Sequence, residues 1–201
     1  MKRKILSAAL TAAALIVAGC GADDDAGTIA SKAPGNSIDR AFVADMVPHH
    51  QSAVEMATIA QDRGQSQFVK RLAGDIIRTQ NEEISTMRRV DKTLAVAGVK
   101  KGSLGVPEHM TGMTDDPQTL KTANPFDRAF LRMMIPHHQG AIEMALVEGV
   151  KGSNPTLQAL GQNIIRAQQR EIREMRKELG DAGGTDGAAD EEGGHGSGHS
   201  G

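Results

Sequence analysis

Histidine pairs flanked by methionines occur twice in this 201-residue chain. The segment DRAFVADMVPHHQSAVEMA, which starts at Asp39, returns as DRAFLRMMIPHHQGAIEMA from Asp127, with 13 of 19 positions identical. Imidazole and thioether together suit copper, and thioether in particular selects Cu(I). The repeated pattern therefore predicts a copper site, with Cu(I) favoured. Its candidate ligands are Met46, His49, His50, Met56, Met134, His137, His138 and Met144.

The spacing within each segment places these side chains on one helix face. Met46 precedes His49 by three residues and His50 by four, and Met56 follows His49 by seven. Residues at these separations lie on the same side of a helix. Adjacent imidazoles are costly to bury without partners, and a metal ion would be such a partner. Taken singly, each methionine or inward histidine is equally compatible with ordinary core packing.

The repeat continues beyond the histidines at a constant offset of 88 residues. IIRTQNEEISTMRR, from Ile76, matches IIRAQQREIREMRK, from Ile164. Apolar residues at helical spacing predict one helical hairpin in 38–97 and another in 125–180, joined by a crossover loop in 98–124. Two hairpins with matching apolar faces predict an all-α, ferritin-like four-helix bundle, with an approximate two-fold axis relating the histidine pairs.

Local signals refine the first helix. Asn36 or Ser37 is a suitable N-cap, and Gly64 signals the C-terminal end. Pro48, like Pro136 in the second copy, lies inside the helical pattern just before the histidines. Because proline cannot donate to the carbonyl four residues earlier, we expect a kink or a local break there.

Further potential ligands lie outside the repeated positions. Met133 adds a thioether beside His137 in the second copy only, and the crossover loop carries His109, Met110 and Met113. These residues could extend the metal site. The alternative interpretation is a mobile loop whose histidine and methionines are incidental.

Two rival functions remain open. A ferritin-like di-metal enzyme would require Glu83 and Glu171 to point inward, each beside a glutamine, Gln80 or Gln168. Two carboxylates are few for such a centre, and the sequence has no nucleophile elbow, phosphate loop or catalytic triad, so we predict no enzymatic activity. The other rival is a structural or partner-binding bundle without metal, in which the histidines only hydrogen-bond inside the core.

The N-terminal 19 residues have the features of a lipoprotein-type export signal. A basic start and an apolar run lead to IVAGC, which resembles the bacterial lipobox, and its Cys20 is the only cysteine. We expect cleavage before Cys20, lipidation of its thiol and anchoring on the extracytoplasmic face of the cytoplasmic membrane, or on the outer membrane. Residues 20–37 would form a flexible tether, and 181–201 a disordered Gly/Asp/His tail.

Composition limits the partners. The chain has 23 Lys and Arg against 25 Asp and Glu, with no Trp or Tyr, and it has no basic cluster. Nucleic-acid binding is therefore unsupported. The expected partners are the membrane, through the lipid on Cys20, and a protein that donates or accepts copper.

The doubled MxPHHxxAxEMA pattern, with QxxEIxxM downstream, resembles a bacterial exported family catalogued as domain of unknown function three hundred and five. The resemblance covers about residues 38–180. It implies a ferritin-like helical bundle and, because some members bind copper or confer copper resistance, a copper-binding function. The family motif falls on the eight Met and His ligand candidates and does not distinguish the two histidines of each pair.

Overall fold

The computed structural model describes residues 34–180 as four long helices. These are α1 (Ser37–Arg63), α2 (Gln67–Val96), α3 (Phe126–Lys151) and α4 (Pro155–Leu179). The α2–α3 crossover contains two short 3-10 helices, η1 (Glu108–Met110) and η2 (Pro117–Lys121), and no strand occurs in this part of the chain. The predicted all-α four-helix fold is thus confirmed. The predicted signal peptide, Cys20 and the C-terminal tail lie outside the described residues.

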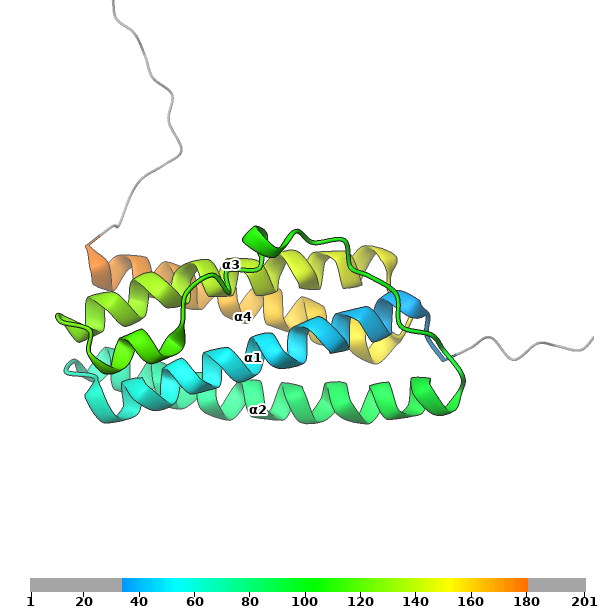
Figure 1. The fold of residues 1–201 in the computed structure, drawn as a ribbon, viewed down its shortest axis with the longest axis horizontal. Coiled ribbons are helices and arrows are strands. Elements are labelled where there is room, and N and C mark those ends of the chain that lie inside the picture. The colour runs from blue at the N-terminus through cyan, green and yellow to red at the C-terminus, as the bar shows by residue number, and fades with distance from the viewer. Residues whose placement is uncertain (1–33, 181–201) are drawn as a thin grey trace, which may run out of the picture. The chain divides into compact units, whose positions relative to one another are not determined.

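The helices form two hairpins that pack on each other mainly through α1 and α3 (Figure 1). α1 packs along α2 and α3 packs along α4, whereas α2 and α4 make little contact. The crossover returns along the bundle before α3 begins, so α1 and α3 run in opposite directions (Figure 1). This antiparallel arrangement allows equivalent positions of the two repeats to meet near the middle of both helices.

The helix ends are fixed by local hydrogen bonds. The Asn36 side chain caps α1 by accepting from the N–H of Ile38 at 2.8 Å and of Asp39 at 3.2 Å. Asp39 accepts in return from the Asn36 N–H, which completes a capping box. α4 ends at Gly180, whose φ of 81° lies in the left-handed region that glycine adopts readily.

Two repeat-related aspartates tie the hairpins together. The Asp39 carboxylate accepts hydrogen bonds at 3.0 and 2.8 Å from two backbone N–H groups in the turn 153–154. The Asp127 carboxylate accepts two at 2.9 and 2.8 Å from the turn 65–66. Both the aspartates and the turns are 88 residues apart, so each hairpin is latched to the turn of the other. This contact explains why the repeated segment begins with aspartate.

Neither proline interrupts its helix. α1 continues through Pro48 and α3 through Pro136, so of the kink or local break expected there the break is wrong, while the kink stays a prediction. Proline removes one hydrogen bond, to the carbonyl four residues earlier. The helix continues because buried residues on both sides of it, such as Met46 and Ala53, are held in the core.

The crossover packs closely against the bundle. Leu104 and Leu120 bury their side chains, leaving 3% and 1% exposed. At its midpoint Gly112, with φ of 69°, lies against the Pro136 carbonyl, and a Cβ added at Gly140 would overlap the Thr111 backbone. These two glycines let the loop backbone approach α3 directly, beside the histidines.

No helix in the described region is long and apolar enough to span a membrane.

The core of the described region consists of two hydrophobic clusters. One contains Phe42 and Met46 of α1, and the other contains Met56 of α1 with Phe130 of α3. Each cluster combines residues from both hairpins, so neither hairpin forms a core alone.

Candidate metal centre

All four repeated histidines are buried at the contact between α1 and α3. The exposed fractions are 1% for His49, 0% for His50, 2% for His137 and 0% for His138. The rings of His49 and His137 meet with centroids 3.8 Å apart and planes inclined by 38°. The His50 ring lies at a centroid distance of 6.2 Å from that of His49. The structure therefore brings the two sequence motifs together.

One histidine of each pair is oriented by a glutamate. His50 Nε2 lies 2.8 Å from Glu83 Oε2, and His138 Nε2 lies 2.6 Å from Glu171 Oε2. In the neutral imidazole Nε2–H then donates to the carboxylate, which leaves the lone pair on Nδ1. A carboxylate behind a histidine is the usual arrangement that fixes ring tautomer and orientation at metal sites.

The crossover loop contacts the other histidine of the first pair, His49, by a hydrogen bond, but makes none to its counterpart His137. His49 Nε2 donates to the Thr111 carbonyl at 2.9 Å, which again leaves Nδ1 as the free nitrogen. Neither ring nitrogen of His137 has a hydrogen-bond partner. The loop thus orients one member of the stacked pair and leaves the other unconstrained by hydrogen bonds.

Five imidazole nitrogens in this cluster are buried without a partner. They are Nδ1 of His49, His50, His137 and His138, and Nε2 of His137. Leaving a buried polar group unsatisfied costs about 1–3 kcal/mol, so native proteins rarely keep several together. A neutral ring has one lone pair, so His137 supplies one donor and the four histidines supply four, which are suited to coordinate a metal ion such as copper.

The electrostatics keep the stacked rings neutral. Burial, followed by the neighbouring His50, lowers the pKa of His49 to about 3. Burial, followed by His49, lowers the pKa of His137 well below its ordinary value. Neutral imidazole is the form that binds metal ions, so no proton has to leave these rings at neutral pH.

Buried methionines accompany the histidines in two sets related by the 88-residue offset. One hydrophobic cluster contains Met46, Met87 and Met144, and the other contains Met134, Met175 and Met56. All six are at most 2% exposed. Met87 and Met175 are not in the repeated histidine motif, although their 88-residue offset and helical spacing could have marked them as further thioethers.

The remaining candidate ligands are less buried than these six methionines. Met133 is half-buried and packs against the cluster that contains Met56 and Met134. His109 is exposed, and Met110 and Met113 are each 43% exposed on the crossover. The loop's contribution to the histidines is the Thr111 carbonyl, which sequence patterns could not reveal because it is a backbone atom.

The inward carboxylates do not assemble a di-metal centre. Glu83 and Glu171 do reach the interior, yet each contacts a separate histidine, as described above. Across residues 34–180, no three His, Cys, Asp or Glu side chains gather into a group that could hold a metal. This applies to the four histidines as well as to the carboxylates, so a copper site here would need methionine sulfur to complete its ligand set. The side-chain oxygens of Gln80 and Gln168 are buried without partners, so glutamine does not satisfy the histidines either.

Comparisons with known proteins identify relatives of this fold. CopM in its Cu(I)-bound form is 34% identical over 71% of this chain and 96% of its own, with a TM-score of 0.61. A fragment from Deinococcus radiodurans is 34% identical over 74% of this chain and 99% of its own, with a TM-score of 0.61.

A protein from Streptomyces coelicolor that is described as secreted is 32% identical over 72% of this chain and 92% of its own, with a TM-score of 0.63. A comparison with curated proteins finds no match. The model of the domain of unknown function DUF305 matches residues 39–179, which include all four helices almost completely. The chain therefore belongs to the DUF305 family.

Proposed function

We propose that the protein binds Cu(I) at the buried histidines and holds it for sequestration or for transfer to another protein. The five unpartnered imidazole nitrogens carry this proposal. His49, His50, His137 and His138 supply nitrogen, and Met46, Met56, Met134 and Met144 supply sulfur. CopM, which shares the fold, was solved with Cu(I), Cu(II) and silver bound, and this supports a soft metal as the ligand here.

The ligand chemistry favours Cu(I) over harder ions. Thioether is a soft donor that selects Cu(I), while imidazole accepts several transition metals. Because carboxylates contact the histidines from behind, through Nε2, they orient the rings rather than supply hard oxygen ligands. A site that uses both imidazole and thioether also explains why the repeat preserves methionine and histidine together.

A competition titration tests this proposal. The full chain with Cys20→Ser is titrated anaerobically with Cu(I) against bicinchoninate, since the Cys20 thiol would itself bind Cu(I). We expect tight binding that weakens by more than about tenfold in the double variant His49→Ala/His137→Ala. The double variant His50→Ala/His138→Ala measures separately how much the two glutamate-oriented histidines contribute to Cu(I) affinity.

The variant His109→Ala is the matched control, because this histidine is exposed on the crossover loop. It should bind copper like the parent chain, and circular dichroism should show equal helix content in all variants. Unchanged binding after loss of all four buried histidines would contradict the proposal. Equal weakening by His109→Ala would contradict it as well.

We also propose that the mature protein is exported and anchored by a lipid on Cys20. The lipobox-like sequence before the only cysteine supports this location. Mass spectrometry of the protein from the membrane fraction should find an acylated N-terminal Cys20, and Cys20→Ser should release the chain from that fraction. An unmodified Cys20 thiol in the mature protein would contradict the anchor.

A further inference from the structure

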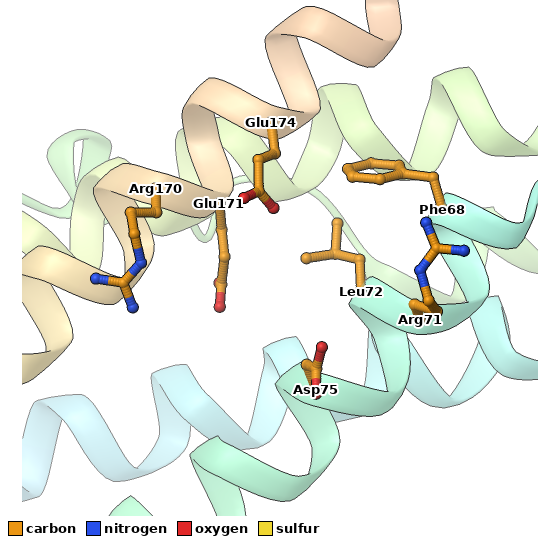
Figure 2. A pocket seen from close by; sticks show the side chains of 7 residues that line it. All are labelled: Phe68, Arg71, Leu72, Asp75, Arg170, Glu171 and Glu174. Carbon is orange, nitrogen blue, oxygen red and sulfur yellow. The ribbon is translucent and has the colours of Figure 1, made fainter.

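A charged cavity opens between α2 and α4, which make little contact with each other. It has a volume of about 230 Å³ and contains Leu72 together with five ionisable side chains. Figure 2 shows side chains of the two helices facing this space, with Asp75 on α2 and Glu171 and Glu174 on α4. The ionisable residues are Arg71, Asp75, Arg170, Glu171 and Glu174.

A second opening between the same helices is related to the first by the internal repeat. Its lining includes Asn163, Thr86 and Ala159, which lie 88 residues from Asp75, Glu174 and Arg71 respectively. The other lining residues are Pro155, Thr156 and Leu160, so this opening has no ionisable side chain. The duplicated fold therefore provides two equivalent spaces, of which only one has become charged.

The charged cavity is connected to the histidine cluster by a single side chain. Glu171 lines the cavity and keeps 19% of its side chain exposed, while its Oε2 atom lies 2.6 Å from Nε2 of His138. The His138 side chain is 0% exposed. Displacing this carboxylate would open the His138 ring to the cavity and release it from the tautomer that Glu171 fixes, so that either ring nitrogen could meet an ion.

We propose that this cavity is the port through which a Cu(I) ion reaches and leaves the buried histidines, with Glu171 as its gate. The inference rests on the proposed copper-binding function and adds the route and its direction. Asp75, Glu171 and Glu174 outnumber Arg71 and Arg170 in the lining, so the cavity has a net negative charge that attracts a cation, although Asp75 also pairs with Arg78 at 3.2 Å. Glu171 then passes the ion to His138. The repeat-related opening has no charge to attract the ion and does not serve as a second port.

Blocking each opening tests the route. In the Cys20→Ser chain, Asp75→Cys places one thiol at the charged port, and Asn163→Cys places one at the equivalent position of the neutral opening. Alkylation with N-ethylmaleimide then fills one opening or the other with the same group. Each full-length protein is loaded with Cu(I) anaerobically and mixed with bicinchoninate at concentrations where the release rate no longer depends on the chelator.

We expect the alkylated Asp75→Cys protein to release Cu(I) several-fold more slowly than the unalkylated Cys20→Ser parent chain, with an unchanged equilibrium affinity. The alkylated Asn163→Cys protein should release it at the parent rate. Equal release rates in the two alkylated proteins would overturn the port. Loss of equilibrium binding in the parent chain itself would instead overturn the copper-binding function, so the two failures are distinguishable.

Charge neutralisation provides a second test that leaves the cavity open. The double variant Asp75→Asn/Glu174→Gln should load silver nitrate about tenfold more slowly at low ionic strength, because steering of a cation by the mouth is lost. The matched change at the neutral opening, Asn163→Ala/Thr86→Ala, should leave the rate unaltered. The difference should vanish at about 1 M salt, where screening extends to only about 3 Å. A salt-independent difference, or none at low salt, would overturn the role of the carboxylates.

Discussion

His49 and His137 stack at a ring-centroid distance of 3.8 Å and are equivalent residues of the two repeats, 88 positions apart. A residue that meets its own counterpart lies at the symmetry axis of a duplicated fold. The contact therefore places the approximate two-fold axis of the bundle between these rings. One histidine donates to the Thr111 carbonyl and the other has no hydrogen-bond partner, so the crossover loop breaks the symmetry at this point.

The unpartnered ring of His137 predicts a conflict between stability and metal binding. His137→Phe removes two buried nitrogens that lack partners and keeps an aromatic ring in place. We expect the free energy of unfolding of the metal-free protein to rise by about 1 kcal/mol, while Cu(I) affinity falls. Urea unfolding and the bicinchoninate competition measure the two effects. His49→Phe is the contrast, because it breaks the bond to Thr111 and should not stabilise; equal stabilisation by both changes would refute this explanation.

The buried histidine rings also predict how the free energy of unfolding changes at acid pH. The pKa of His49 is about 3 in the folded protein and about 6.5 when the chain is unfolded. Below pH 6.5 His49 is protonated in the unfolded chain but stays neutral in the folded protein. The free energy of unfolding therefore falls as the pH is lowered towards 3. The slope contributed by His49 is about 1.4 kcal/mol per pH unit. Urea unfolding of the metal-free chain between pH 3 and 7 checks it, and His49→Phe should show a shallower slope; the same slope in both would be inconsistent with a buried neutral ring.

The buried carboxyl pair of Glu148 and Asp39 predicts the opposite trend at higher pH, where the free energy of unfolding falls as the pH rises. Burial and the adjacent Asp39 raise the pKa of Glu148 to about 8. Burial alone would raise the pKa of Asp39 too, yet hydrogen bonds from the Asn36 N–H and from the turn 153–154, together with the neighbouring Glu148 carboxyl, hold it below its ordinary value. Glu148 is thus the protonated member of the pair, and its buried oxygens have no hydrogen-bond partner in the described residues.

The folded-state pKa of Glu148 is raised, so its contribution to stability is complete below about pH 4.5, declines as the pH rises towards about 8 and is constant above. Glu148→Gln keeps a neutral donor at this position. We expect this variant to lose the decline between pH 6.5 and 8 in urea unfolding measurements. A parent protein whose stability is already flat in this range would show that Glu148 is ionised in the fold.

Gly140 predicts how sensitive the histidines are to the crossover. A Cβ added there would overlap the Thr111 backbone, so Gly140→Ala should push the loop away and break the His49–Thr111 hydrogen bond. We expect lower stability and weaker Cu(I) binding. Gly149→Ala in the same helix is the control, because its Cβ would meet nothing within 4 Å and alanine favours helix by about 1 kcal/mol. If both variants were equally stable, the loop would not be in contact with α3 at this point.

Much of the fold could be predicted from the sequence because the repeat and the helical spacing are strong local signals. The α1 helix was expected from residue 38 to about 63 and spans Ser37–Arg63, with the predicted Asn36 cap. Of the kink or break expected at Pro48, the break does not occur, because proline is a local signal whereas the packing that keeps α1 continuous is tertiary.

The surroundings of the histidines were harder to predict. The sequence raised Glu83 and Glu171 only as inward residues that a di-metal enzyme would require, and their pairing with His50 and His138 depends on contacts between the two helices of each hairpin. The Thr111 carbonyl and the asymmetry between His49 and His137 depend on the path of the crossover, which has no periodic pattern. The copper ligands proposed from the motif remain predictions that metal-binding experiments must test.

Nitrogen-15 NMR of the histidine rings, recorded on the full Cys20→Ser chain before and after one equivalent of silver nitrate, tests the central claim most directly. The proposed site predicts shifts at Nδ1 of His49, His50 and His138 and at a ring nitrogen of His137, while the Nε2–H groups of His50 and His138 keep their protons on Glu83 and Glu171. Shifts confined to His109, His195 and His199, with the four buried rings unchanged, would contradict a metal site between α1 and α3.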